Sequence, residues 1–465
     1  MVIKSKSNWI EDAIFYQIFP DRFYNGDLTN DPTNTELWSG ISTRTNFFGG
    51  DLKGIIDKLN YLKSLGVNAL YLTPIFTANT NHKYDIVDYY KIDHHFGDQK
   101  IFDNFLESAH AQGIHVVLDA VFNHVGYDFW AFQDVIKFGE SSPYVNWFYI
   151  EDLPITAAPK PNYATYENAY YLVKLNIHNP EVRDYLYDVA RYWTQKGIDG
   201  WRLDVPYLMN HNFWKGFRQV VKKINPELYI VGEIWEKATD WLQGDECDGV
   251  MNYQLRDLII DFFVNKKLNA STFNKKLASL RKENPGETVY NMLNLLGSHD
   301  TPRFLTLCKA NKQLFKLGVA FLFTYIGIPM IYYGDEIGMT GENDPGCRGT
   351  MVWEYSKQDQ EFLEWHRQLI QIRKAHSALR RGTFRKVFAS NDVYVFERQH
   401  NIDQVIVIFN RGNKTQSVYL PDKYLRGKLS IQDELSGQIY EIDKPIEVQG
   451  LSTLILSNKL VKLEK

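Results

Sequence analysis

The sequence has 465 residues, of which 44% are hydrophobic and 23% charged, and its formal net charge is −4 at pH 7. This composition describes a soluble globular protein of two or more domains, or one built on a large barrel. It excludes a basic surface for nucleic acid, and no apolar run is long enough to span a membrane.

The aromatic content of 15% favours a carbohydrate ligand, because aromatic faces bind sugar rings, although aromatic residues also fill cores. The cysteines Cys247, Cys308 and Cys347 are scattered and odd in number, which argues against a disulfide framework. The amino terminus contains no apolar run of the length of a secretion signal. We therefore expect a cytoplasmic protein, although a secreted protein that has lost its signal would show the same sequence.

Short apolar strands alternate with amphipathic helices along most of the chain. Repeated strand-then-helix units imply a parallel sheet, and about eight of them suggest a closed barrel. A doubly wound open sheet is the alternative, but no glycine-rich phosphate loop follows any strand. Strands are expected at 13–19, 67–72, 115–122, around Trp201, 228–232, 249–253, 289–296 and 330–333, and helices at Leu52–Leu65, 102–111, after Pro180 and at 213–224.

The alternation is interrupted twice. From about residue 123 to 173 the sequence is aromatic and shows little periodicity. After about residue 383 it changes to short β-rich runs, such as 393–396 and 405–409, without helices between them. The end of the chain is therefore predicted to form an all-β domain.

Polar residues cluster where the predicted barrel strands end, which is where a barrel carries its catalytic side chains. The acids Asp204, Glu233 and Asp300 follow the fourth, fifth and seventh strands. Arg202 precedes Asp204 by two positions, so both side chains lie on one face of the strand, and the guanidinium favours the ionised carboxylate that a nucleophile needs. Each acid alone could be a helix cap, and Arg202 with Asp204 a structural pair. Their combination favours an active site.

Four stretches carry a family resemblance: DAVFNH at 119–124, GWRLDV at 200–205, GEIW at 232–235 and GSHD at 297–300. In order and spacing they resemble the signature regions of the α-amylase family of glycoside hydrolases. Further stretches at 48–52, 72–76, 81–85, 174–176 and 343–348 make the chain most similar to the cyclomaltodextrinase, neopullulanase and maltogenic amylase group.

The resemblance implies an α/β fold with three parts. These are a (β/α)8 TIM barrel at 1–123 and 173–382, an inserted domain at 124–172 after strand three, and a C-terminal β-sandwich at 383–465.

By resemblance, Asp204 is the nucleophile, Glu233 the general acid/base and Asp300 the transition-state stabiliser of a retaining reaction. Such a reaction needs two carboxyl groups about 5–5.5 Å apart. Apolar Ile234 and Trp235 beside Glu233 are expected to raise its pKa. The alternative for the outer residues of the site is ordinary cleft lining. Substrate contacts are implied for His82, Tyr84, His124, Arg202, Trp235, His299, Asp344 and Arg348.

Oxygen-bearing side chains are concentrated in two loops after the first strand. Such hard ligands without cysteine or histidine suit Ca²⁺, but Asn and Asp also form Asx-turns. The group resembles a calcium site of neopullulanase relatives, so we expect a structural Ca²⁺ here. The expected ligand residues are Asn25, Asp27, Asn30, Asp31, Gly49 and Asp51. The second calcium site of amylases is not expected, because Tyr207 and Leu208 replace its Lys-His pair.

The sequence departs from the group at two positions that face the acceptor side of the cleft. Pro-Tyr-Leu stands at 206–208 where the group usually has Ala-Asn-Glu, and Glu236 stands where it usually has histidine. The resemblance therefore does not predict which products are formed or how strongly the enzyme transglycosylates. The group also begins with an extra β-domain that builds its dimer, whereas this sequence starts at the barrel. We expect a monomer, or a dimer unlike that of the group, with a more open cleft.

The expected function is retaining hydrolysis of α-1,4-glucosidic bonds in maltooligosaccharides, cyclodextrins, starch or pullulan. It would proceed through a covalent glucosyl-Asp204 intermediate, with some transglycosylation. The alternative is an α-glucan glucosyltransferase or a trehalose-forming mutase on the same machinery. A non-catalytic binding subunit is disfavoured because the three acids are present and a membrane span is not. Neither nucleic acid nor membrane is expected as a partner.

Overall fold

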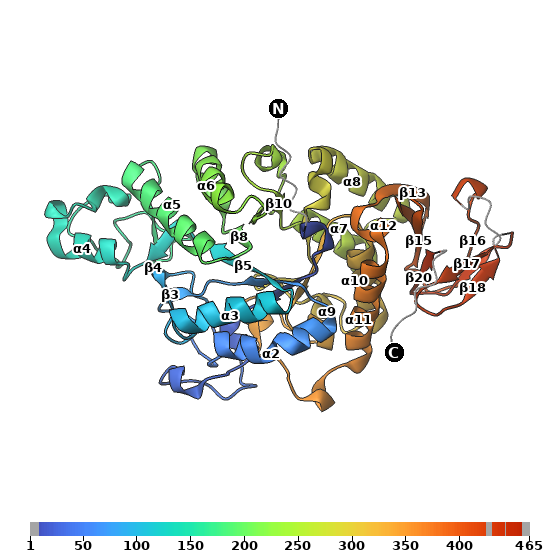
Figure 1. Ribbon diagram of the computed structural model, residues 1–465, viewed down its shortest axis with the longest axis horizontal. Coiled ribbons are helices and arrows are strands. Elements are labelled where there is room, and N and C mark those ends of the chain that lie inside the picture. The colour runs from blue at the N-terminus through green and yellow to red at the C-terminus, as the bar shows by residue number, and fades with distance from the viewer. Residues whose placement is uncertain (1–8, 425–429, 442, 458–465) are drawn as a thin grey trace.

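The structure is a computed structural model that describes residues 9–424, 430–441 and 443–457. Its centre is an eight-stranded sheet in the order β10-β9-β8-β5-β2-β1-β12-β11, parallel throughout (Figure 1). A parallel bridge between Met251 and Leu293 joins the two outer strands and closes the predicted barrel. The strands are β1 Phe15–Ile18, β2 Ala69–Leu72, β5 His115–Ala120, β8 Gly200–Leu203, β9 Tyr229–Gly232, β10 Gly249–Val250, β11 Leu293–Asn294 and β12 Ile328–Tyr332.

Helices surround the barrel, and polar side chains cap most of their starts. Asp51 accepts a hydrogen bond from the Gly54 N–H at the start of α2, which ends at Gly66 in a left-handed conformation with φ of 100°. The bounds predicted for this helix are confirmed. None of the helices in the described part of the chain is long and apolar enough to cross a bilayer. The main helices are α2 Leu52–Leu65, α3 Gln99–Ala111, α5 Pro180–Gln195, α6 His211–Ile224, α7 Tyr253–Ile259, α8 Ala270–Glu283, α10 Lys312–Thr324 and α11 Gln360–Ala375.

Two stretches of the barrel differ from the sequence expectation. The strand predicted at 289–296 is only β11, because a 3-10 helix occupies Gly286–Tyr290. An additional antiparallel hairpin, β3 Phe76–Ala78 with β4 Ile86–Ile92, follows β2. Acidic and basic residues interrupt the apolar pattern of β4, which explains why periodicity did not reveal it.

The stretch predicted as an insert, 124–172, projects from the barrel at one end of the molecule (Figure 1, teal). It begins with β6 His124–Gly126, which pairs antiparallel with β7 Leu172–Lys174, and contains α4 Trp130–Phe138. Aromatic rings pack its interior: Phe132 lies 4.9 Å from both Phe148 and Tyr163, centroid to centroid. The irregular backbone around this aromatic core accounts for the missing periodicity.

The C-terminal domain is antiparallel throughout and lies at the opposite end of the molecule (Figure 1, red). Its two sheets enclose a second core that includes Val395, Ile406, Ile408 and Val448, so the predicted β-sandwich is confirmed. Residues 1–8 of the predicted barrel, and 425–429, 442 and 458–465 of the predicted sandwich, lie outside the described residues. The strands are β13 Thr383–Ser390, β14 Val393–His400, β15 Asp403–Asn410, β20 Ser452–Ser457, β17 Ser430–Asp433 and β18 Ile439–Glu441, with β16 Gln416–Val418 and β19 Ile446–Val448 in the small sheet.

Candidate active site

Arg202, at the end of β8, is fully buried and contacts three carboxyl groups. Its Nη1 donates to Oδ1 of Asp204 at 2.7 Å and to both oxygens of Asp119 at 2.9 and 3.0 Å. Its Nη2 forms an ion pair with Oε2 of Glu233 at 2.9 Å. The side-by-side placement expected for Arg202 and Asp204 is present, and one guanidinium also serves two further acids from neighbouring strands.

The protonation of this cluster follows from its charge. Burial raises the pKa of Asp204, with Arg202 opposing it and the Glu233 and Asp119 carboxyls adding to it. Burial also raises the pKa of Glu233, again against the influence of Arg202. Because one cation faces three acids, the cluster favours holding a proton. The expectation that Arg202 keeps Asp204 ionised is therefore not met: Arg202 lowers the pKa of Asp204, but burial and the two neighbouring carboxyl groups outweigh it and the pKa is raised.

Glu233 follows β9, and its carboxyl group has two donors besides Arg202. The Val205 N–H donates to its Oε2 at 3.0 Å, and the Trp235 indole N–H donates to its Oε1 at 3.1 Å. Both hydrogen bonds lower the pKa of Glu233. The expected rise in the pKa of Glu233 is present and comes from burial, whereas the Trp235 indole N–H lowers this pKa by donating to the carboxylate. Val205 directs its N–H from a left-handed backbone with φ of 34°.

Asp300 follows β11, which β10 separates from β9 in the closed sheet, and lies within a second charge cluster. Nη2 of Arg348 donates to its Oδ1 at 3.1 Å, and Nε2 of His299 lies 3.3 Å from its Oδ2. Burial raises the pKa of Asp300, but His299 and Arg348 outweigh it and the pKa is lowered overall. Arg348 also pairs with Asp344 at 3.0 Å, and Asp344 with Arg44 at 3.3 Å. Asp300 is therefore held as a carboxylate.

A chain of hydrogen bonds joins the two clusters. Nε2 of Gln17 donates to Nδ1 of His299, so Nε2 of His299 carries the hydrogen and donates to the Tyr84 hydroxyl at 2.6 Å. That hydroxyl donates in turn to Asp119 at 3.0 Å, and Tyr71 donates to the same carboxyl oxygen at 2.7 Å. The sequence reasoning missed Gln17, Tyr71 and Asp119 as members of the site. Asp119 opens the DAVFNH stretch at the end of β5, so its place at a strand end was the available signal.

Two further predicted histidines line the same region. His124, on β6, stacks on Tyr166 with ring centroids 4.9 Å apart, and its Nε2 is buried without a hydrogen-bond partner among the described residues. Nδ1 of His82 accepts from the Tyr84 N–H at 3.1 Å, in the β3–β4 turn. Burial lowers the pKa of His82, of His124 and of His299 to about 3, so their rings are neutral. Tyr166 was missed, because it lies in the aperiodic insert.

Partly exposed aromatic side chains lie beside Glu233. Trp235 is 38% exposed and stacks on Tyr253 with centroids 3.6 Å apart. Tyr207 is 49% exposed, and its pKa is raised by burial and by the charges of Glu233 and Asp204. Its side chain therefore lies in the electrostatic range of both acids, in the stretch where the sequence departs from the group.

The residues predicted to bind calcium fit a cation in part. In the part of the chain that the structure describes, the side-chain carbonyl oxygens of Asn25 and Asn30 are buried without hydrogen-bond partners, and Asn25 Nδ2 lies 2.7 Å from Oδ1 of Asp31. A Cβ on Gly49 would lie 2.2 Å from the same Asp31 oxygen, so Gly49 closes the loop tightly around it. Burial raises the pKa of Asp31, and this effect outweighs the hydrogen bond from Asn25 and the charge of His95, which lower it.

Asp27 and Asp51, the other two acids predicted at this site, are engaged by local hydrogen bonds. Asp27 accepts from the backbone and side chain of Thr29, and Asp51 accepts from the Gly26, Asp27 and Gly54 N–H groups. They act here as turn and helix caps.

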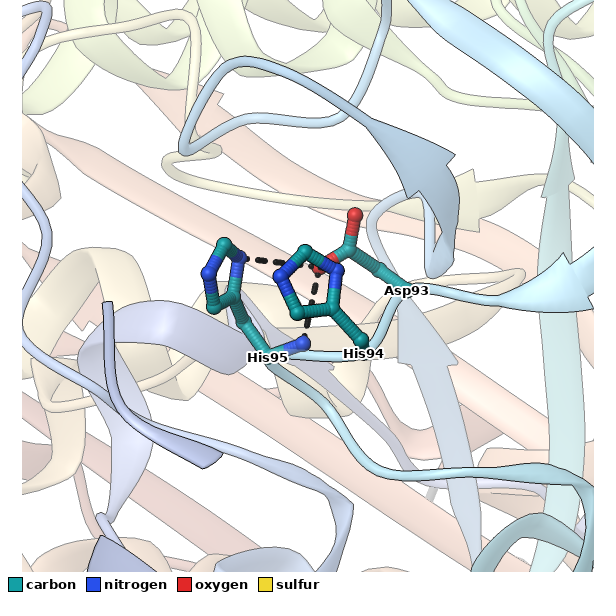
Figure 2. A group of neighbouring side chains, drawn as sticks. All are labelled: Asp93, His94 and His95. Carbon is teal, nitrogen blue, oxygen red and sulfur yellow. Dashed lines mark hydrogen bonds and ion pairs between the residues drawn. The ribbon is translucent and has the colours of Figure 1, made fainter. Parts of the chain in front are cut away.

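A cluster of Asp93, His94 and His95 brings three possible metal ligands together after β4 (Figure 2). The Asp93 carboxylate pairs with the buried Lys83 ammonium at 2.9 Å and accepts from the Ala78 and His95 N–H groups. Burial raises the pKa of Asp93, but the His95 side chain, the Lys83 charge and the Ala78 N–H outweigh it and lower the pKa to about 2. The neighbouring ammonium disfavours a bound cation, so the cluster is structural.

Comparison with known proteins gives two family matches. The family described as alpha amylase, catalytic domain, matches residues 17–362, and the alpha-amylase C-terminal domain matches residues 382–446. The cyclomaltodextrinase of Thermoanaerobacter pseudethanolicus is 48% identical over 89% of this chain and 72% of its own. Neopullulanase 2 of Thermoactinomyces vulgaris is 46% identical over 92% and 74%.

A solved structure extends the similarity over both chains almost completely. It is the cyclic α-maltosyl-(1→6)-maltose hydrolase of Arthrobacter globiformis in complex with that saccharide. The two structures agree with a TM-score of 0.92 at 45% sequence identity, over 97% of this chain and 100% of the other.

Proposed function

This chain belongs to the α-amylase family of glycoside hydrolases and acts on α-glucans, and on this premise we propose that it cleaves α-1,4-glucosidic bonds with retention of configuration. The observation that carries the proposal is the contact of one buried guanidinium, that of Arg202, with both Asp204 and Glu233. Two carboxyl groups held by the two ends of one guanidinium are compatible with the short spacing, about 5–5.5 Å, of retaining enzymes.

In the proposed reaction Asp204 attacks the anomeric carbon while protonated Glu233 donates its proton to the glycosidic oxygen. The C–O bond breaks, the leaving glucan departs with a new hydroxyl, and a glucosyl ester forms on Asp204. Glu233, now a carboxylate, then takes a proton from water, which attacks the ester and restores both acids. Burial raises the pKa of Asp204 as well as that of Glu233, so the proton of the cluster is assigned to Glu233 by the match of the GEIW stretch to the general acid of the family. The lowered pKa of Asp300 supports a permanent negative charge beside the oxocarbenium-like transition state.

The proposed substrate contacts follow from groups that line the site. His124 Nε2 is buried without a protein partner, which suits a hydrogen bond to a sugar hydroxyl. Other proposed contacts come from Tyr84, which is hydrogen-bonded to both His82 and His299. Arg348, which pairs with Asp300 and Asp344, supplies the next ones together with Asp344. Trp235 would contact the leaving side, and Arg202, being fully buried, would act through the carboxylates rather than touch the sugar.

Maltooligosaccharides and cyclodextrins are the substrates we propose, because the cyclomaltodextrinases among the relatives are 46–48% identical to this chain. Cyclic α-maltosyl-(1→6)-maltose is a second candidate. Its support is the Arthrobacter globiformis hydrolase, the whole of whose structure matches 97% of this chain. Starch and pullulan are the remaining candidate substrates. Glucosyl transfer or trehalose formation is the competing function, and the same assay tests it.

A structural Ca²⁺ is proposed at the loops after β1. The unpartnered oxygens of Asn25 and Asn30, with Asp31 and the Gly49 segment, would hold it, and it would tie the two loops together. A cytoplasmic location is also proposed. A Bacillus subtilis relative, 42% identical over 97% of this chain, is described as an intracellular maltogenic amylase. The monomer, or a dimer unlike that of the group, stays a prediction that light scattering tests.

A side-by-side assay tests the proposed function. The protein is incubated separately with β-cyclodextrin, cyclic α-maltosyl-(1→6)-maltose, maltotriose, pullulan and starch, products are separated by chromatography, and the first anomer formed is identified by NMR. We expect α-configured maltose and glucose, fastest from the cyclic substrates. First-formed β-anomers would contradict retention, and trehalose from maltose would establish the competing function.

A further inference from the structure

A pocket of about 450 Å³ lies between the barrel and the C-terminal sandwich, and none of its lining residues belongs to the candidate active site. Side chains near the starts of α10 and α11 form its barrel wall, and the β17–β20 region of the sandwich forms the facing wall. Figure 1 shows α10 and α11 next to these strands. Barrel helices run antiparallel to the strands, so the starts of α10 and α11 lie toward the barrel end that carries the catalytic acids.

The two walls each contribute a partly exposed aromatic ring. Trp365 comes from α11 and Tyr440 from β18. The Trp365 indole N–H donates to the Lys316 carbonyl oxygen at 3.1 Å, which holds the ring against α10. Rings from two domains facing one pocket provide apolar surfaces of the size of a pyranose ring.

Hydrogen-bonding groups surround these rings. Side-chain amides come from Gln313 on the barrel and from Gln438 and Gln449 on the sandwich, and all three side chains are exposed to solvent. Glu447 adds a carboxylate acceptor on the same wall. Each amide offers both donors and an acceptor, which matches sugar hydroxyls, since these also donate and accept.

The charge of the pocket disfavours an anionic ligand. Lys316 is the cation among the described lining residues, and its ammonium lies 3.2 Å from Oε1 of Glu361 and 4.3 Å from the Trp365 ring centroid. Glu447 provides an exposed acid on the sandwich wall, whereas the buried Asp433 carboxylate accepts from the Ser436 and Ile455 N–H groups. Phosphates and nucleotides are therefore disfavoured, and a neutral polyhydroxylated ligand fits best.

We propose that this pocket is a second saccharide-binding site, which holds a segment of an α-glucan chain while another part of the chain is in the active site. The choice of an α-glucan rests on the activity of the family, whereas the choice of a neutral saccharide rests on the lining of the pocket. A site of this kind raises the local concentration of polymeric substrate near the cleft. It leaves short substrates, which cannot reach both sites, unaffected.

The experiment measures binding without turnover. Maltoheptaose is titrated by calorimetry into protein carrying Asp204→Asn, alone and combined with Tyr440→Ala or with Trp365→Phe. We expect two sites in the parent and, with Tyr440→Ala, at least about tenfold weaker binding at one of them. Tyr419→Ala, which removes a 70% exposed tyrosine of the same domain outside the pocket, is the matched control and should retain both sites.

Kinetics of the otherwise unchanged enzyme provide the second measurement. Tyr440→Ala is expected to lower kcat/KM on starch several-fold and to leave kcat/KM on maltotriose unchanged. One saccharide site in the Asp204→Asn protein, or two sites that persist at full affinity after Tyr440→Ala and Trp365→Phe, would overturn the proposal. Because calorimetry does not depend on catalysis, an error in the proposed reaction would leave this binding result intact.

Discussion

Nη2 of Arg202 lies 2.9 Å from Oε2 of Glu233, while Nη1 of the same guanidinium lies 2.7 Å from Oδ1 of Asp204. The two acids follow neighbouring strands, β8 and β9, which pair in parallel register with Leu203 opposite Gly232. This register places the ends of both strands at one level of the barrel. Arg202 therefore couples the proton affinity of the two carboxyl groups that would perform the two halves of the reaction.

Removal of the guanidinium should destabilise the protein most at neutral pH. Arg202→Met leaves the buried carboxylates of Asp119, Asp204 and Glu233 without their cation, which costs about 3–5 kcal/mol. At acidic pH these groups protonate and the loss shrinks. Urea unfolding at pH 7 and pH 5 measures this difference. Arg191→Met removes an exposed pair with Asp188 and should change stability little at either pH. If Arg202→Met lowers the free energy of unfolding equally at both pH values, Arg202 does not stabilise the three carboxylates through its charge.

Asp204→Asn and Glu233→Gln should each lower kcat on maltotriose by several orders of magnitude, because each removes one half of a coupled mechanism. Both changes conserve side-chain size, so circular dichroism and the melting temperature should show a folded protein. Asp240→Asn, an exposed change outside the site, serves as the control and should retain full activity. Near-normal activity in either variant would rule out the catalytic role proposed for the residue that was changed.

Trp235→Phe should move the alkaline limb of the pH profile of kcat/KM to higher pH. The indole N–H bond to Glu233 stabilises the charged carboxylate, so its loss raises the pKa of this acid, by roughly one pH unit for a bond of ordinary strength. Phenylalanine retains the ring that faces Tyr253. Tyr253→Phe leaves the indole donor in place and should leave the limb where it is. A limb that moves to lower pH after Trp235→Phe would refute the donor role.

Chelation should lower the melting temperature if the loops after β1 hold Ca²⁺, because a ligand specific to the folded state stabilises it by mass action. Asn25→Ala and Asn30→Ala should reduce the difference in melting temperature between calcium and EDTA. Asn104→Ala, on the exposed face of α3, should not change it. Metal analysis completes the test. An unchanged melting temperature with no bound metal would show that these residues form turns and do not bind calcium.

Glu336 should make stability fall as pH rises toward neutrality. Burial raises the pKa of Glu336 to about 7, although hydroxyls of Tyr16 and Tyr61 donate to its Oε1 at 2.8 and 2.6 Å. The folded state thus binds a proton more tightly than the unfolded state, so this contribution is complete below pH ~4 and lost as pH passes 7. It amounts to roughly 3 kcal/mol. Thermal unfolding of Glu336→Gln at pH 5 and pH 8 should show a smaller difference than the wild type, whereas exposed Glu364→Gln should match it.

The helices and most barrel strands could be predicted because their signals are local. The stop at Gly66 and the apolar face of α2 lie within one short window of sequence. The hairpin β3–β4 and the elements inside the aromatic insert, such as α4, escaped prediction because their apolar residues follow no single period. Their packing partners, such as Phe132 with Tyr163, lie far apart in the sequence.

The sequence by itself determined the family, the barrel and the three acids, because motifs at strand ends need only order and spacing to be recognised. The tertiary structure decided how those acids interact. It joined Arg202 to Glu233 and Asp119 as well as to Asp204, and it turned the Trp235 N–H toward Glu233. Proton affinity depends on burial and on charges a few ångströms away. Those distances are set when strands remote in the chain pair in register, and residue order alone does not contain them.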